Sequence, residues 1–481
     1  MIALDQQIVE AFTEINVKRE YVFYKTIKTD LFTADCVKIQ MGVDGVDFQN
    51  FERNLDKFAY SICNRIRNGR YFFSPFLEVA VSKDPSLDRA EAIAANKFRC
   101  ISIATIKDVI MQRLLYRELE PIVEERFREI PIVSYAYRRG LSAPTAVRKI
   151  HEYVTNDEYL YVLDADLSKF FDTIPHDKLF CSIEDFFGAG NVLTLKLIRR
   201  FYSADRVLWD EHPKELKDYK VLKPKRTVRK ENGIRQGIPQ GGVLSGMLAN
   251  IYMHSFDKWV IDTLASSFDI KYVRYADDFV VLFKEKGQEQ EVFNRIKDKL
   301  LEMGLIIHNI GEKTKFIDLS LEKKERLEFV GFEVIPGRIR VREANIQKFK
   351  NRINEILDKT TIKSESPYRS IQHLIKLISF KILGNESFGK ICPQCERPYP
   401  RRSWMSYFLS VTDVRQLRNL DFWIRKSIYQ KLFYSSDIRL TRRQLRSYEL
   451  PSLEKVYYKY KKLLSRETDQ ECCSCKGSIS C

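Results

Sequence analysis

The fold is decided by the stretch Val273-Arg274-Tyr275-Ala276-Asp277-Asp278-Phe279-Val280-Val281-Leu282-Phe283. β-Branched and aromatic residues run up to two adjacent aspartates and resume directly after them, which predicts a β-hairpin with the acids at its turn. Two neighbouring carboxylates on a tight turn repel each other and lose hydration unless a cation lies between them. Their oxygen atoms suit Mg²⁺. The alternative is a solvated Asp-Asp turn, so the choice depends on whether further acidic ligands occur elsewhere.

A second acidic strand occurs far upstream, within residues 159–167. Leu163 and Leu167 flank Asp166 there, and a buried carboxylate is costly without a partner. Only the folded chain can bring Asp166 to Asp277. Two strands that each supply an aspartate to a pair of Mg²⁺ ions form the two-metal arrangement for nucleotidyl transfer. One ion lowers the pKa of the attacking hydroxyl, and the other holds the triphosphate and the leaving pyrophosphate.

The chain of 481 residues is basic, with 81 Lys and Arg against 65 Asp and Glu and a formal net charge of +16. This excess indicates nucleic acid as a partner rather than a membrane, since no amphipathic anchor accompanies it. Hydrophobic residues make up 44% of the chain, enough for folded cores in about three domain-sized units. No apolar run is long enough to span a membrane and no secretory leader is evident, so we expect a cytoplasmic protein.

Three motifs resemble the palm motifs of reverse transcriptases, most closely those of the bacterial group II intron-type branch. They are Asp166-Leu167-Ser168-Lys169-Phe170-Phe171-Asp172, Gly237-Ile238-Pro239-Gln240-Gly241-Gly242 and Tyr275-Ala276-Asp277-Asp278. The similarity extends over residues 42–435 in the family's order. It implies an α+β right-hand polymerase with an antiparallel palm sheet backed by helices. The implied parts are an N-terminal extension (1–41), fingers (42–158), palm (159–340, with a basic insertion within 205–232), helical thumb (341–435) and a basic, Cys-rich tail (436–481).

The resemblance also implies roles for individual side chains. Asp166 and Asp277 would bind both Mg²⁺ ions with help from Asp278, and the activity would be RNA-templated DNA synthesis from dNTPs. Lys313 occupies the position of a proton donor to pyrophosphate, although an ordinary surface lysine is the alternative.

Further implied roles concern the incoming nucleotide. Phe171 is at the position of a steric gate against the ribose 2′-hydroxyl, with a plain core Phe as the alternative. Gln240 would lie against the nucleotide, and Gly241 would let the backbone approach it closely. Three cations would hold the triphosphate: Lys97, Arg99 and Arg138. Lys97 and Arg99 share one face of a predicted strand, so an ordinary solvated strand face is the alternative.

The sequence departs from intron-encoded enzymes in three places. It has Val243-Leu244-Ser245-Gly246 where those enzymes have Ser followed by Pro, and Arg139 where they have Pro. The basic stretch Lys223-Pro224-Lys225-Arg226-Thr227-Val228-Arg229-Lys230 is inserted upstream of Gln240. Such a loop either neutralises phosphates or is a solvated loop.

The C-terminal part is predicted to be helical, then basic and rich in cysteine. Cations interleaved with Tyr457, Tyr458 and Tyr460 suit RNA, although a helix packed on the thumb through its tyrosines is equally compatible. Two Cys-x-x-Cys pairs could together supply four thiolates to a structural Zn²⁺, and the alternative is a tail of reduced thiols. The four cysteines are Cys392, Cys395, Cys472 and Cys475.

The biological role is the least determined part. The short stretch after the thumb, without a His-rich nuclease motif, favours a free-standing antiviral-defence or Abi-type reverse transcriptase that copies a dedicated non-coding RNA. The alternatives are an intron maturase without its endonuclease segment, and a catalytically idle RNA-binding scaffold. The intact acids argue against the scaffold, since a binding module has no reason to keep unpaired acids facing a polyanion. The sequence does not decide between primer types, including a protein hydroxyl, or between templated and template-independent synthesis. It also does not decide between a monomer, a homo-oligomer and a complex with a partner protein.

Overall fold

The computed structural model describes residues 3–28, 41–84, 87–208, 230–231, 233–363, 365–384, 391–393, 396–397, 403–436 and 438–462. None of the helices in these ranges combines the length and the hydropathy that crossing a membrane requires. Most of the predicted basic insertion, residues 223–229, lies outside the described residues.

A four-stranded antiparallel sheet in the order β7-β8-β3-β9 forms the centre of the structure. Its side chains alternate between two faces, as strands require. Leu163, Phe279 and Val281 share a core with α9, α11 and α13, whereas Val162 and Val280 share a second core with α7. The strands are β3 (Tyr161–Asp166), β7 (Ile270–Tyr275), β8 (Asp278–Phe283) and β9 (Lys315–Asp318).

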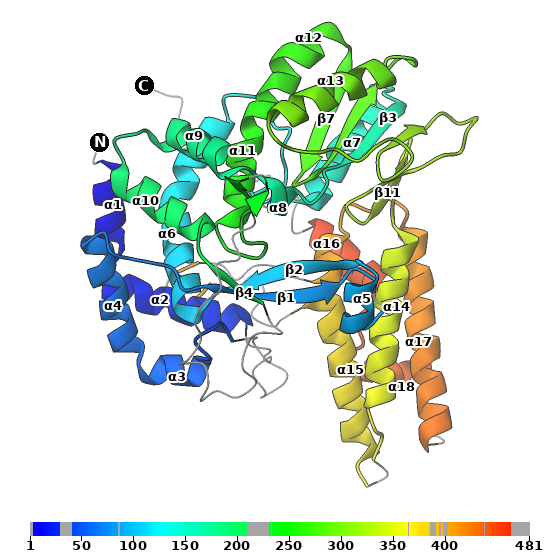
Figure 1. Ribbon diagram of the computed structural model, residues 1–481. Coiled ribbons are helices and arrows are strands. Elements are labelled where there is room, and N and C mark those ends of the chain that lie inside the picture. Colours follow the sequence, from blue (N-terminus) through cyan, green and yellow to red (C-terminus); the bar gives the residue numbers. More distant parts are fainter. Residues whose placement is uncertain are drawn as a thin grey trace, which may run out of the picture.

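Helices therefore cover both faces of this sheet (Figure 1). A small antiparallel sheet follows in the order β10-β11-β12 and also contacts α7. These elements are α7 (Ala143–Thr155), α8 (Phe170–Thr173), α9 (His176–Phe187), α10 (Val192–Tyr202), α11 (Ser245–Trp259), the π-helix η3 (Val260–Leu264), α12 (Ala265–Ser267), α13 (Glu289–Glu302), β10 (Leu327–Phe329), β11 (Phe332–Ile335) and β12 (Arg338–Val341).

The N-terminal part combines helices with a separate three-stranded sheet. Strand β1 pairs antiparallel with β2 and parallel with β4. Helix α6 begins after Thr105, whose side chain accepts a hydrogen bond from the backbone N–H of Asp108. The elements are α1 (Leu4–Ala11), α2 (Glu14–Lys28), α3 (Phe48–Arg53), α4 (Leu55–Arg67), β1 (Phe76–Ser82), α5 (Arg89–Ala94), β2 (Phe98–Ile103), α6 (Ile106–Phe127), β4 (Arg206–Leu208), β5 (Lys230–Glu231) and β6 (Ile234–Arg235).

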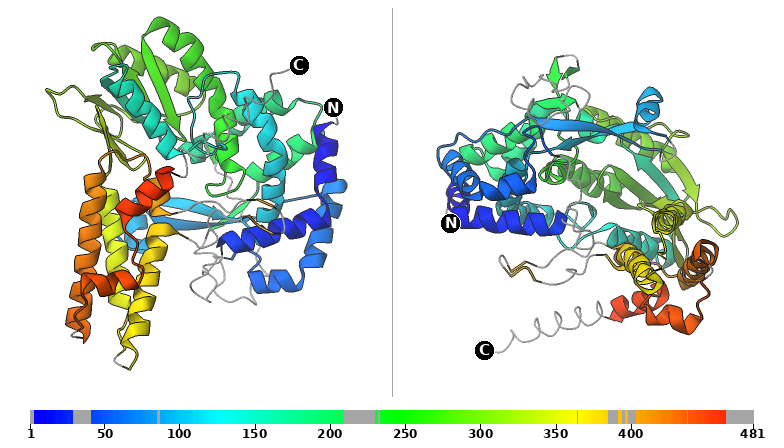
Figure 2. Two further views of the ribbon diagram at one scale, coloured as in Figure 1. Left: turned by 180° about the vertical axis from the view of Figure 1, so that it is seen from behind. Right: turned by 90° about the horizontal axis from the view of Figure 1, so that it is seen from below.

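The C-terminal part is helical, as predicted. Helices α14, α15 and α17 run side by side, and α18 crosses them (Figures 1 and 2). Helix α15 ends at Leu383, where Gly384 adopts φ +81°, a left-handed conformation that glycine takes without strain. The elements are α14 (Glu343–Lys359), α15 (Pro367–Leu383), α16 (Trp404–Tyr407), α17 (Val414–Ser436) and α18 (Arg442–Ser447), followed by helical residues 453–462. With its antiparallel sheets and separate helices, the chain belongs to the predicted α+β class.

Candidate active site

The predicted acidic hairpin is present and turns in two residues. Tyr275 pairs with Asp278 at the ends of β7 and β8, which leaves Ala276 and Asp277 as the turn. Ala276 has φ +61°, a left-handed conformation that costs a residue with a Cβ roughly 1–2 kcal/mol. A positive φ at this position is characteristic of tight hairpin turns, whose twist matches that of the strands. The strained turn presents Asp277 at the tip of the hairpin.

Strand pairing brings the upstream acid to this turn. Asp166, the last residue of β3, lies directly opposite Asp278, the first residue of β8. Asp164 is two residues before Asp166 and therefore lies on the same face of the sheet, opposite Val280. No role was predicted for Asp164, although residues two apart on a strand share a face, which would place Asp164 beside Asp166. Four carboxylates thus gather at one end of the sheet.

Burial and neighbouring charges raise the pKa values of three of these carboxylates, Asp164, Asp277 and Asp278. Burial, followed by the charges of Asp277 and Asp166, raises the pKa of Asp278. Burial and the charge of Asp166 raise the pKa of Asp277, which Lys313 and Arg274 partly offset. The pKa of Asp164 rises to about 7, mainly through burial. Without a cation, the folded chain therefore favours protonated forms of acids that are ionised in water at neutral pH.

Two basic side chains reach this acidic cluster from the loop before β9. Lys313 donates a hydrogen bond from Nζ to Asp166 Oδ2 over 2.5 Å. The Nε2 atom of His308 lies 3.6 Å from the same oxygen, while its Nδ1 lies 3.4 Å from Glu312 Oε2. His308 was not predicted, because nothing in the local sequence shows that the loop folds back onto β3. Lys313 thus lies within reach of the acids, as its proposed role requires.

The donor set fits a divalent cation, although the ligands are not preassembled. Within the described residues, no group of three or more His, Cys, Asp or Glu side chains has the geometry of a metal site. The ammonium of Lys313 instead occupies one oxygen of Asp166. Burial and the charge of Asp166 raise the pKa of both Asp277 and Asp278, and Mg²⁺ would neutralise this local negative charge. Asp166, Asp277 and Asp278 are therefore the residues that would hold it.

A buried ion pair holds the acidic turn in place. The Arg274 side chain is 1% exposed, and its Nε and Nη2 atoms donate to the two carboxylate oxygens of Asp257 on α11 over 2.8 and 2.5 Å. Its Nη1 donates to the carbonyl oxygens of Asn250, on the side chain, and of Ala276, in the turn. Arg274 thus connects the turn to α11. A charged side chain within an otherwise apolar strand is a signal of a buried partner, but the sequence did not show which residues pair with Arg274.

Phe171 and Tyr137 lie together beside the acids. Phe171 is half-buried, and its ring meets that of Tyr137 edge to face with centroids 6.4 Å apart. Partial burial and the charge of Asp277 raise the pKa of Tyr137 to about 12. Gly246 on α11 lies under the same ring, since a Cβ there would be 2.4 Å from Tyr137 Cγ. Tyr137, for which no role was predicted, thus links the predicted gate to α11.

Gln240 and Gly241 lie against the β1–β2 sheet. The backbone N–H of Ser102 donates to the Gln240 carbonyl over 2.7 Å. Gly241 adopts φ +113°, and a Cβ there would be 3.0 Å from the Ser102 carbonyl oxygen. Only glycine therefore fits this close approach without strain. The contact joins the nucleotide motif to β2, the strand that carries Arg99.

The three predicted phosphate-binding cations differ in their surroundings. Arg99 is exposed on β2 and makes no ion pair with any residue in the described ranges. Lys97 precedes β2, with its side chain 59% exposed and Nζ 3.5 Å from Asp84. Arg138 is only 5% exposed, pairs with Glu124 over 2.9 Å and stacks on Phe127. All three remain proposed phosphate contacts, although Arg138 would have to share its guanidinium with Glu124, as Lys97 would share its ammonium with Asp84.

The predicted zinc ligands are largely outside the described residues. Cys392 is buried. The structure does not describe Cys395, Cys472 or Cys475.

A comparison with protein families identifies the chain. Residues 83–334 match the family "Reverse transcriptase (RNA-dependent DNA polymerase)", and this segment is more than half of the chain. The chain belongs to the reverse transcriptase family. It is accordingly an enzyme of the RNA-directed DNA polymerase class, and its α+β architecture is that of a right-hand polymerase. Reverse transcriptases use Mg²⁺, in agreement with the donor set described above.

Several curated proteins are similar to this reverse transcriptase. Protein YkfC of Escherichia coli K12 is 25% identical over 340 residues, which are 63% of this chain and 78% of YkfC. The group II intron-encoded protein LtrA of Lactococcus lactis is 25% identical over 329 residues, 54% of this chain and 49% of LtrA. The chain thus spans about half the length of LtrA. Among solved structures, telomerase from Candida albicans aligns with a TM-score of 0.39 and 13% identity, over 78% of this chain and 62% of the telomerase chain.

The raised carboxyl pKa values predict how stability depends on pH. Unfolded aspartates titrate near pH 3.9, whereas Asp164 titrates at about 7 in the folded chain and Asp277 and Asp278 are also raised. The folded state then binds more protons across this window, so the free energy of unfolding falls as pH rises. We expect thermal unfolding in EDTA to show a lower midpoint at pH 8 than at pH 5, and Mg²⁺ to raise the midpoint more at pH 8. Asp278→Asn should flatten this dependence, and an equal Mg²⁺ effect at both pH values would contradict it.

Proposed function

We propose that this reverse transcriptase adds dNTPs to a 3′-hydroxyl under the direction of an RNA template, with Asp166, Asp277 and Asp278 as the catalytic acids. The observation that carries the proposal is the strand register, which places Asp166 directly opposite Asp278 and beside the turn that holds Asp277. The raised pKa values of Asp277 and Asp278 support it, because perturbed carboxylates cluster at functional sites.

The chain's own groups then have distinct tasks. When bound, Mg²⁺ would polarise the attacking hydroxyl and the triphosphate. Arg99 and Lys97, both exposed, would hold the triphosphate from the β1–β2 sheet, and Arg99 can do so bidentately. Lys313, released from Asp166, would donate a proton to the leaving pyrophosphate. The Gln240 backbone, fixed to Ser102, would support the base.

Phe171 is proposed as the gate that excludes the ribose 2′-hydroxyl. Its ring is braced edge to face by Phe170 and Tyr137, so it cannot easily move away from a bulkier sugar. We expect Phe171→Val to lower the preference for dNTP over rNTP by about 10- to 100-fold, with little change in dNTP incorporation. Single-nucleotide incorporation with matched dNTP and rNTP measures this ratio. The control is Phe72→Val, an exposed ring on the N-terminal part; an unchanged ratio in Phe171→Val would remove the gate assignment.

The domain division is proposed as fingers, palm and thumb, at the boundaries that the sequence analysis gives. The palm boundary at residue 340 falls within β12, and α14, α15 and α17 form the proposed thumb. A structural Zn²⁺ held by Cys392, Cys395, Cys472 and Cys475 is also proposed.

For the biological role, we propose a defence-associated reverse transcriptase that copies a dedicated non-coding RNA. Support comes from the departure at Ser245-Gly246, where intron enzymes carry Ser and Pro. Gly246 packs directly under the Tyr137 ring, so this chain has its own arrangement next to the gate. The similarity to LtrA favours the alternative, an intron-encoded maturase.

Sequencing of the nucleic acid that co-purifies with the protein tests the role and the activity together. We expect one discrete RNA with wild type and with Asp277→Asn, and matching cDNA with wild type alone. The locus of that RNA separates a defence system from an intron. If neither protein carries or makes DNA when dNTPs and Mg²⁺ are supplied, the RNA-binding scaffold is the better account.

A further inference from the structure

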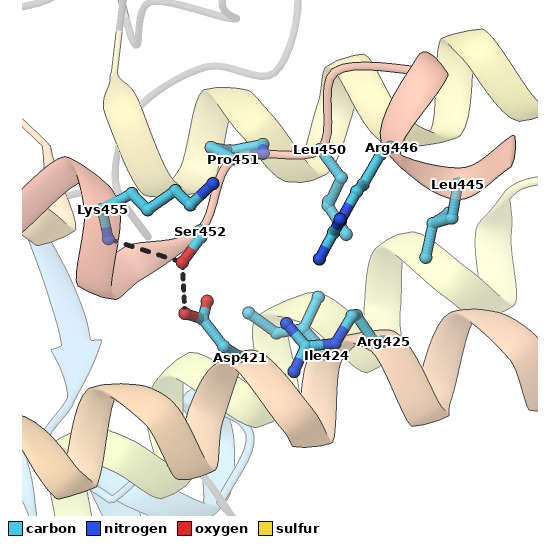
Figure 3. A pocket seen from close by; sticks show the side chains of 9 residues that line it. All are labelled: Asp421, Ile424, Arg425, Leu445, Arg446, Leu450, Pro451, Ser452 and Lys455. Carbon is cyan, nitrogen blue, oxygen red and sulfur yellow. Dashed lines mark hydrogen bonds between the residues drawn. The ribbon is translucent and has the colours of Figure 1, made fainter. Parts of the chain in front are cut away.

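A cavity in the C-terminal helices, far along the chain from the acids, has the properties of an anion site. It lies between α17, α18 and the helical residues 453–462, and its volume is about 410 Å³ (Figure 3). Pockets of about 300–1,000 Å³ hold small molecules or parts of larger ones. Ile424 and Leu445, both buried, form part of its apolar wall. We call it the C-terminal cavity.

Three cations from three different elements line the C-terminal cavity. They are Arg425 on α17, Arg446 on α18 and Lys455 in the last described helix. Figure 3 shows the guanidinium groups of Arg425 and Arg446 directed into the cavity from opposite walls. None of the three side chains makes an ion pair or a hydrogen bond with another residue in the ranges that the structure describes. Like charges around one cavity repel each other unless an anion lies between them.

The one acid in the lining, Asp421, is committed to the structure. Its Oδ2 accepts from the Ser452 hydroxyl over 2.6 Å and from the Glu454 N–H over 3.3 Å, and its Oδ1 accepts from the Leu453 N–H over 2.8 Å. Asp421 thereby caps the helix that begins at residue 453, whose first N–H groups have no partner within the helix. Its charge fixes the cavity wall, and the three cations remain available to a ligand.

We propose that the C-terminal cavity binds the phosphodiester backbone of a nucleic acid. The planar guanidinium of an arginine can donate two parallel hydrogen bonds to a phosphate, and the ammonium of a lysine adds a further donor. This inference rests on the proposed function, since it takes the RNA or DNA that the enzyme handles as the ligand. It adds a second contact, built from residues outside the motifs that surround the acids.

The helix that follows the cavity favours a polymer over a free phosphate ion. Lys455 and Lys459 are four residues apart and both are exposed, so they follow each other along one face. The opposite face is buried through Leu453 and Tyr457, whose hydroxyl donates to the Val411 carbonyl over 2.7 Å. The helix at residues 453–462 therefore packs through one face and presents lysines on the other. The two arrangements predicted for this segment, packing through a tyrosine and a cationic surface, are thus compatible with each other. A row of lysines that leads away from a cationic cavity matches successive phosphates of one strand.

Binding measurements on a charge-matched pair of double variants test the proposal. Arg425→Gln/Arg446→Gln removes two cavity cations, and Lys426→Gln/Arg443→Gln removes two exposed cations from the same helices. Fluorescence anisotropy with single-stranded RNA and DNA of one sequence gives affinities over a range of salt. We expect the cavity variant to bind about 100-fold more weakly. The slope of log affinity against log salt should fall by about 1.4, since each single-strand phosphate contact contributes about 0.7. The control variant should match wild type in affinity and in salt slope. Whether the binding of RNA or of DNA is weakened identifies the nucleic acid that the cavity contacts.

Other outcomes would overturn the proposal. Equal losses in both double variants would show a diffuse charge effect, and no loss in either would show that the cavity binds no backbone. Displacement of the oligonucleotide by inorganic phosphate at millimolar concentration, in wild type but not in the cavity variant, would show a site for free phosphate instead. If the double variant unfolds, Lys455→Gln alone is expected to lower the slope by about 0.7. Primer extension on the same samples separates the two hypotheses: a wild type that binds but adds no dNTP contradicts the proposed activity and leaves the binding result intact.

Discussion

Asp277→Asn is expected to lower dNTP incorporation by about 1,000-fold or more, because it removes a proposed metal ligand from the tip of the hairpin and with it the charge stabilisation of the transition state. The fold should not suffer. Asp277 lies in a two-residue turn beside Asp278, and removing one of the four crowded carboxylates relieves repulsion. We therefore expect the thermal midpoint of the metal-free variant to be at least as high as that of wild type. Primer extension and thermal unfolding in EDTA measure the two effects.

The control for this prediction is Asp298→Asn, an exposed aspartate on α13 that should leave both quantities unchanged. Loss of activity together with a lower midpoint would point to unfolding rather than to a missing ligand. Full activity in Asp277→Asn would remove the hairpin acids from the mechanism.

The second large effect is expected at the buried ion pair between Arg274 and Asp257. Asp257→Ala leaves a guanidinium inside the core without its carboxylate, which costs about 3–5 kcal/mol in comparable cases. Asp257 also accepts the Tyr272 hydroxyl over 2.9 Å, so this phenol loses its partner too. Urea unfolding of the variant and wild type gives the difference in free energy of unfolding. Activity should fall as well, because Arg274 holds the carbonyl of Ala276 in the turn.

The double variant Arg274→Met/Asp257→Leu separates the charge from the packing. Replacing both partners by apolar side chains removes the unpaired charge, so much of the lost stability should return. Activity should stay low, since the turn has lost its donor to Ala276. If the free energy of unfolding of Asp257→Ala is within about 0.5 kcal/mol of that of wild type, water reaches the ion pair and the pair does not hold the turn in place.

Local patterns were sufficient to predict the hairpin, the acidic strand and the C-terminal helices. Apolar runs on either side of Asp277 and Asp278 predict the hairpin, although only Asp277 lies in the turn and Asp278 begins β8. Apolar positions at helical spacing define α14 and α15. Contacts between distant segments were not predictable in the same way. Asp257 and Asn250 precede Arg274 by 17 and 24 residues, and no local pattern relates them.

The pairing of Arg138 illustrates the same limit. The motif around Arg138 suggested a phosphate contact, but the structure pairs its guanidinium with Glu124, 14 residues earlier on α6. His308 and Asp164 were overlooked for a related reason, because their importance arises only when β3, β8 and the loop before β9 meet. A residue's type and spacing indicate what it could bind, and only the fold shows which partner reaches it first.

Helix α11 fixes the distance between the two halves of the site. Its first turn carries Gly246 under the Tyr137 ring, its second turn carries Asn250 and its last turn carries Asp257. Asn250 and Asp257 hold Arg274 and so the acidic turn. One inserted residue would rotate everything beyond it by about 100° and shift it by about 1.5 Å, which would take Asp257 away from Arg274. The helix is thus a spacer of set length. Insertions and deletions among related chains should gather in the loops before Gly237 and be absent between Gly246 and Asp257.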